Sequence, residues 1–130
     1  MPRKFTITVI PEMLAVCRMP PDAPVPSWPD GSFLSVTRTA DELSVVVPEA
    51  QVPPGIPKHD GFRALKMAGP LDFGEIGVLA TLSHTLAVAG LSIFVVSTFD
   101  TDYILVKQEN LARAIAAMRQ AGHEVVEPND

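Results

Sequence analysis

The sequence lacks the features that mark several large classes of protein. Its single cysteine, Cys17, excludes an internal disulfide, so we expect a reducing compartment, the cytoplasm. No run of basic residues occurs, and 15 acidic against 10 basic side chains leave a formal charge of −5. This balance argues against nucleic acid or an anionic membrane as a partner. Apolar residues are plentiful, at 47% of 130, and suffice for a packed core.

Sequence patterns for catalysis are missing as well. There is no phosphate-binding P-loop, no zinc-type spacing and no dinucleotide-binding glycine motif. The histidines His59, His84 and His123 are scattered and form no motif with Cys17, which we expect to be a small buried strand residue. We therefore expect a protein that is not an enzyme and that uses no cofactor.

The longest stretch without a charged residue runs from Ile76 to Phe99 and is long enough to span a bilayer. Gly90 and Ser92 interrupt it, and polar residues lie within it. The pattern favours a helix followed by a buried strand, with no membrane span.

The prolines divide the chain in two. Eleven of the 13 lie in residues 1–57, so this part is predicted to consist of strands joined by loops. Residues 39–42 are a plausible hairpin turn and residues 51–61 a linker. The expected strands are 4–10, 13–18, 33–38 and 43–47.

The rest of the chain has a regular pattern. We expect helices over 73–89, ending at Gly90, and over 111–121, with Asn110 as N-cap and Gly122 as its end. The expected strands are 62–68, 92–99, 103–108 and 123–127. The order βαββαβ is the α+β, ferredoxin-like unit, with both helices on one face of an antiparallel sheet.

The predicted helix 73–89 is apolar on several sides. One stripe, expected to face the sheet, is formed by Ile76, Leu79, Ser83, Leu86 and Gly90, and a second side carries Val78, Leu82 and Ala89. A helix of this kind is covered by more than its own sheet. We expect a second half-domain and a second subunit to cover it, which predicts a homodimer.

The stretch "PLDFGEIGVL", residues 70–79, precedes this helix. Asp72 and Glu75 have the spacing of a capping box. That interpretation leaves Gly74 and Gly77 unexplained, since a glycine within a helix costs about 1 kcal/mol relative to alanine. Two explanations remain open: close packing of the helix on a strand, or a helix start that receives a carboxylate at its free N–H groups.

The stretch "STFDTDYILV", residues 97–106, joins two predicted strands. Asp100, Thr101 and Asp102 gather at the corner without a cation beside them. An Asx-type turn explains this, and so does a site for an amine. A metal site is a weaker interpretation because no third ligand is in sight. If two units pair side by side, this corner and the helix start meet across an interface and together match a free amino acid.

These two stretches carry a family resemblance. "GEIGVL" and "STFDTDYILV" resemble the ACT domain, a small-molecule-binding regulatory module, and within it the branch of the CASTOR arginine sensors and their small bacterial relatives. The resemblance implies a truncated ACT-like N-terminal half over 1–60 and a complete ACT domain over 61–130. It also implies that a free amino acid is bound at an interface between ACT units.

Carried over by position, the resemblance assigns roles to individual residues. Gly77 and Val78 present backbone groups to the ligand, Asp102 anchors its amine, Phe99 forms a wall, and Glu75 meets a basic side chain. The sensors hold four ACT-like units and this chain two, so a homodimer restores their arrangement. The candidate ligand-binding residues are Asp72, Glu75, Gly77, Val78, Leu79, Thr98, Phe99, Thr101 and Asp102.

The expected function is therefore that of a non-catalytic regulatory protein that binds an amino acid. The alternative is a dimerisation module that kept the ACT fold and lost the pocket. A small enzyme such as an isomerase would need a titratable pair, which only Asp72, Glu75 and Asp102 supply.

Overall fold

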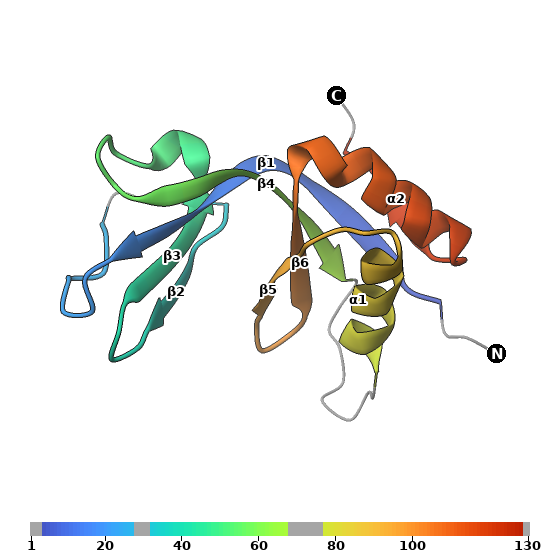
Figure 1. The fold of residues 1–130 in the computed structure, drawn as a ribbon, viewed down its shortest axis with the longest axis horizontal. Coiled ribbons are helices and arrows are strands. Elements are labelled where there is room, and N and C mark those ends of the chain that lie inside the picture. Colours follow the sequence, from blue (N-terminus) through green and yellow to red (C-terminus); the bar gives the residue numbers. More distant parts are fainter. Residues whose placement is uncertain (1–3, 28–31, 68–76, 129–130) are drawn as a thin grey trace. The chain divides into compact units, whose positions relative to one another are not determined.

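In a computed structural model, the chain forms strands and two α-helices (Figure 1). The structure describes residues 4–27, 32–67 and 77–128. The strands are β1 (Thr6–Met19), β2 (Ser35–Arg38), β3 (Leu43–Pro48), β4 (Lys58–Met67), β5 (Phe94–Ser97), β6 (Asp102–Lys107) and β7 (Glu124–Val126), and the helices are α1 (Val78–Val88) and α2 (Leu111–Gln120).

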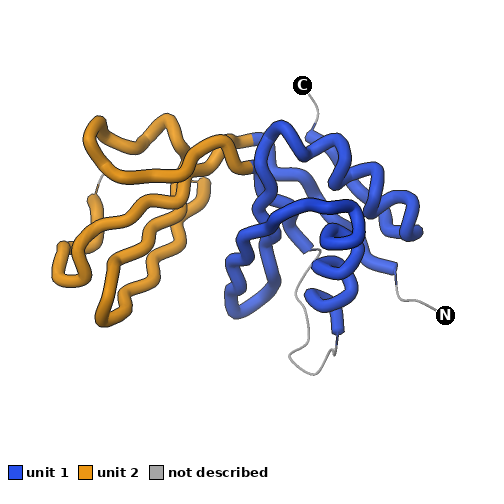
Figure 2. The backbone as a smooth tube through the Cα atoms, viewed as in Figure 1, with its two compact units in different colours: residues 1–11, 63–130 blue, residues 12–62 orange. Residues whose placement is uncertain are grey.

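The chain divides into two compact units (Figure 2). Unit 1 consists of residues 1–11 and 63–130, and unit 2 of residues 12–62. The sequence suggested a division near residue 60, and the structure adds the first eleven residues to the C-terminal unit. That the N-terminal part is a truncated ACT-like half stays a prediction.

Unit 1 contains the predicted order βαββαβ, from β4 to β7. Its strands lie in the order β7-β1-β4-β6-β5, so the start of β1 occupies the place between β4 and β7. Thr6 to Thr8 pair in parallel with Glu124 to Val126. The N-terminal strand is therefore an integral part of the C-terminal unit.

The core of unit 1 lies between this sheet and the two helices. Alternate residues of each strand point toward the helices, as the period of a strand requires. The buried core residues contributed by the strands are Ile7, Val9, Leu65, Met67, Ile104, Val106 and Val125. Each is 6% exposed or less, so burial of this apolar surface stabilises the unit.

Helix α1 begins directly after Gly77 and buries Val78, Leu82 and Leu86. The predicted side of the helix that faces the sheet was therefore wrong. Leu86 is buried as expected, but Ser83 is only partly buried and Gly90 is exposed. Both sides of this helix are apolar, so hydrophobic periodicity did not determine which side faces the core. Ile76 lies outside the described residues.

The charge-free stretch forms helix α1 followed by strand β5, as predicted. None of the helices in the described part of the chain has the length and apolar character that a membrane crossing requires.

Helix α2 is amphipathic and buries Ala114, Ile115 and Met118. It ends as predicted at Gly122, whose φ of 96° favours glycine. The predicted capping by Asn110 is wrong in one respect, because its side chain makes no capping hydrogen bond. A 3-10 turn over Gln108–Asn110 leads into the helix.

Unit 2 is built from β2, β3, the second part of β1 and the first part of β4. Residues 14–19 of β1 pair antiparallel with β3, and β3 pairs antiparallel with β2. The predicted turn between β2 and β3 is confirmed by a hydrogen bond from Thr39 N–H to the Glu42 carbonyl, at 2.9 Å. Cys17 lies in the apolar core of this unit, and burial raises the pKa of its thiol.

His123 connects the end of α2 to the first strand. It is 5% exposed, and its Nδ1 accepts a hydrogen bond from the backbone N–H of Phe5 at 3.1 Å. Its ring also stacks on that of Phe5, with centroids 5.4 Å apart. Burial, and to a lesser degree the positive charge of Lys4, lowers the pKa of His123 below its ordinary value of 6.5.

We expect the free energy of unfolding to fall as the pH drops below about 6.5. The unfolded chain then takes up a proton on His123 while the folded chain does not, so protons favour unfolding; the slope from this group is at most about 1.4 kcal/mol per pH unit. Denaturant titrations at several pH values measure the effect. His123→Gln should remove this part of the pH dependence, and His84→Gln, at an exposed histidine, should retain it. An unchanged slope in His123→Gln would contradict the assignment.

Candidate functional site

The turn between β5 and β6 is closed by two threonines. Ser97 pairs with Asp102, and the N–H of Thr98 donates to the carbonyl of Thr101 at 2.8 Å. The Thr98 hydroxyl accepts from the N–H of Thr101 at 3.2 Å. The side chain that closes the turn is therefore Thr98, where the sequence interpretation expected an aspartate.

The candidate residues of this turn point in different directions. Phe99 is 83% exposed at the tip, whereas Thr101 is 6% exposed. Asp102 is partly buried and, by the alternation of β6, lies on the same face as Ile104 and Val106, which contact the helices. The carboxylate is thus on the side of the sheet where α1 packs.

The turn is attached to the end of β4. The hydroxyl of Thr101 donates to the carbonyl oxygen of Met67 at 2.8 Å. Met67 is the last residue of β4 and belongs to the core. Figure 1 shows α1 beginning at this same end of unit 1, where β4 stops and the β5–β6 hairpin turns.

The start of α1 offers backbone N–H groups. Gly77 precedes the helix with a φ of 86°, and its carbonyl accepts the first helical hydrogen bond, from Thr81 N–H at 2.8 Å. The amides of Val78 and Leu79 therefore precede the first intrahelical bond and lie at the positive end of the helix dipole. The side chain of Val78 is buried, and that of Leu79 packs against the core, so their backbones are what a ligand would meet.

Gly77 is explained by its conformation. A Cβ atom placed on it would meet nothing within 4 Å, so close packing of helix on strand does not require a glycine there. The positive φ does, because a side chain is strained in this region. Among the described residues, none fills the space beside Gly77.

Two candidate residues cannot be placed in this site. Asp72 and Glu75 lie outside the described residues, as does Gly74. The capping box predicted for the start of this helix is wrong, because the N-cap of α1 is Gly77 and no side chain caps it. Within the described residues, no three His, Cys, Asp or Glu side chains gather as a metal site requires.

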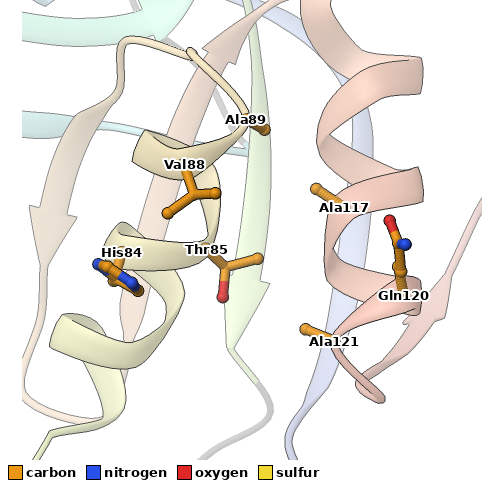
Figure 3. Close-up of a pocket in the computed structure, with 7 residues that line it drawn as sticks. All are labelled: His84, Thr85, Val88, Ala89, Ala117, Gln120 and Ala121. Atoms are coloured by element: carbon orange, nitrogen blue, oxygen red, sulfur yellow. The ribbon is translucent and has the colours of Figure 1, made fainter.

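A groove on the outer side of the helices was not predicted from the sequence. It has a volume of about 400 Å³ and lies between α1 and α2 (Figure 3). The small side chains at successive turns of α2 were the sequence pattern that could have predicted this groove. The groove is lined by His84, Thr85, Val88, Ala89, Ala117, Gln120 and Ala121.

Comparison with known families decides the kind of unit. Residues 58–120 match the family model of the ACT domain. This chain is an ACT-domain protein. Residues 12–55 match a second model, which describes an N-terminal domain. The ACT match spans β4 to the end of α2 and therefore includes both the helix start and the β5–β6 turn.

The ACT-domain protein is related to arginine sensors. The Homo sapiens protein named cytosolic arginine sensor for mTORC1 subunit 1 is 32% identical over 60 residues, as is its Bos taurus counterpart. The match covers 45% of this chain and 18% of either sensor, so the chain spans less than a fifth of these relatives. This confirms the relation to the CASTOR branch that the sequence indicated.

Solved structures confirm the fold. A protein from Agobacterium tumefaciens with a crystal structure is 31% identical in sequence to this chain. Its structure matches with a TM-score of 0.92 over 99% of this chain and 97% of that one. The ligand-free regulatory subunit of aspartate kinase from Thermus thermophilus has a TM-score of 0.59 over 89% of this chain and 96% of that one. At 11% identity, the second likeness shows the fold alone.

Proposed function

We propose that this ACT-domain protein is a non-catalytic regulator that binds a free amino acid. The ligand lies where the start of α1 meets the β5–β6 turn, at an interface between ACT units of two copies. The observation that carries the proposal is that the start of α1 and the β5–β6 turn lie at the same end of unit 1 (Figure 1), where Thr101 bonds the last residue of β4.

The charges of an amino acid match this arrangement. The amides of Val78 and Leu79, at the positive end of the α1 dipole, receive the carboxylate. The Asp102 carboxylate receives the ammonium group through a charge-assisted hydrogen bond. Phe99, 83% exposed at the tip of the turn, supplies an apolar wall once a second unit approaches.

A second copy of the chain is the proposed partner. Helix α1 has no charged residue from Val78 to Val88, and Val88 is 74% exposed. The chain as a whole carries a charge of −5. Two copies therefore approach with least repulsion through an uncharged surface such as this helix.

L-arginine is the first ligand to test, because the relatives whose names state a ligand are arginine sensors. In this proposal, Glu75 meets the guanidinium group of arginine. A different ligand among the twenty amino acids would leave the main-chain contacts unchanged and alter this side-chain contact.

The function is tested by thermal unfolding in the presence of each of the twenty amino acids. At 100 times its Kd, the correct ligand stabilises the folded protein by about 2.7 kcal/mol. The same compound without its α-carboxylate serves as the control and should give no shift. Melting curves that none of the twenty amino acids moves would contradict the proposal.

The alternative function is a dimerisation module with an ACT fold and no ligand. The exposure of Phe99 and Val88 favours it, because a partner surface would cover both. Both functions predict a dimer, so a mass measurement does not separate them. Dependence of the thermal stability on an amino acid does.

A further inference from the structure

We infer that Thr101 is a positioning residue that holds the β5–β6 turn against the end of β4 and does not touch the ligand. The family resemblance places Thr101 among the ligand contacts, and the inference revises that role. It rests on the proposed function, since the turn matters only if it forms part of a binding site.

The direction of the Thr101 side chain is the first observation. The residue is 6% exposed, and its hydroxyl donates to the Met67 carbonyl, which lies 34 residues earlier in the chain, at 2.8 Å. Met67 itself is 1% exposed. The hydroxyl proton of Thr101 is therefore used in a hydrogen bond within the protein. Removing the hydroxyl would take this donor away from the Met67 carbonyl.

The second observation is that the turn is closed on itself. The Thr98 hydroxyl accepts from the Thr101 N–H at 3.2 Å and lies 3.0 Å from the Thr101 carbonyl, to which it donates. These bonds fix the shape of the turn within itself. Strand β6, which follows the turn, pairs with β4 in the sheet, and the Thr101 hydroxyl adds a side-chain bond from the turn itself to the end of β4.

The bond matters because of where Thr101 lies in the turn. Thr101 directly precedes Asp102 and follows the tip that carries Phe99. Met67 ends the strand from which the chain continues toward Gly77. The hydrogen bond therefore fixes the residue that precedes the proposed amine anchor against the end of β4.

The test uses Thr101→Val, which keeps the shape of the side chain and removes the hydroxyl, and Thr101→Ser, which keeps the hydroxyl. Thr37→Val, at an exposed threonine of β2, is the matched control. Amide hydrogen exchange of Thr98 and Thr101 is measured without ligand. The affinity is measured by calorimetry for L-arginine first and then for any other of the twenty amino acids that shifts the melting curve.

In Thr101→Val we expect the amide exchange of the turn to speed up about tenfold and the affinity to fall about tenfold, because one buried hydrogen bond is lost. Thr101→Ser should restore both, and Thr37→Val should change neither. Wild-type exchange and affinity in Thr101→Val would overturn the inference. An equal loss in Thr101→Ser would overturn it too, since the methyl group would then be responsible. If the wild-type protein binds no amino acid, the proposed function fails, and the ligand-free exchange still decides whether the hydroxyl holds the turn.

Discussion

Replacing Asp102 with asparagine should remove about half or more of the stabilisation that the amino acid confers. A hydrogen bond to a charged group contributes about 1.5–3 kcal/mol, so the Kd rises by about 10- to 100-fold. At a concentration of 100 times the wild-type Kd, a 100-fold loss reduces the stabilisation from about 2.7 to about 0.4 kcal/mol. Thermal unfolding with and without ligand measures the difference.

Asp100 provides the matched control for this prediction. It is an exposed acid in the same turn, two residues before Asp102, so Asp100→Asn changes the net charge by the same amount. It should leave the ligand-induced stabilisation unchanged. Equal losses in both variants would mean that the overall charge of the turn, and not an anchor at Asp102, attracts the ligand.

Replacing Gly77 with leucine should abolish binding and weaken the fold. A leucine with the φ of 86° found at Gly77 costs about 1–2 kcal/mol. Its side chain also occupies the space beside the helix start, where no described residue lies within 4 Å of a Cβ atom, and so keeps a carboxylate from the Val78 amide. Denaturant unfolding measures the first effect and calorimetry the second.

Gly55→Leu separates strain from loss of the site. Gly55 has a φ of 88° and nothing within 4 Å of a Cβ atom, but it lies in unit 2. This variant should be destabilised as much as Gly77→Leu while its affinity for the amino acid stays unchanged. Wild-type affinity in Gly77→Leu would contradict the placement of the carboxylate at α1.

Local sequence patterns predicted most of the fold. The glycines at 90 and 122 end the helices, and both have positive φ. This explains why the ends of the helices could be predicted from the sequence. A continuous apolar run from Tyr103 to Val106 marked β6, and the concentration of prolines in residues 1–57 separated the strand-rich part from the helical part. Each of these signals depends on neighbouring residues alone.

The features that the sequence did not predict depend on distant contacts. The N-terminal strand lies beside β7 because the Glu124 N–H bonds the carbonyl of Phe5, a pairing that no local pattern encodes. Helix α1 is apolar on two sides, so its rotation was decided by packing against the sheet. The sequence placed Thr101 in an exposed turn. Its burial goes with a bond to a carbonyl 34 residues away.

Part of the candidate site was predicted from sequence. The acidic turn was identified, but the helix was predicted over 73–89 with Gly77 inside it. The helix begins at Val78, and Gly77 precedes it in a conformation that explains the glycine. The ACT match covers both. The direction of the Thr101 side chain and the groove between α1 and α2 required coordinates, because each depends on which faces of the elements meet.

A crystal structure of the protein grown with the amino acid that raises its melting temperature tests the central claim most directly. The account predicts the ligand's ammonium group at the Asp102 carboxylate and its carboxylate at the amides after Gly77, at an interface where two copies meet. A ligand bound elsewhere, for instance in the groove between α1 and α2, with Asp102 facing solvent, would contradict it.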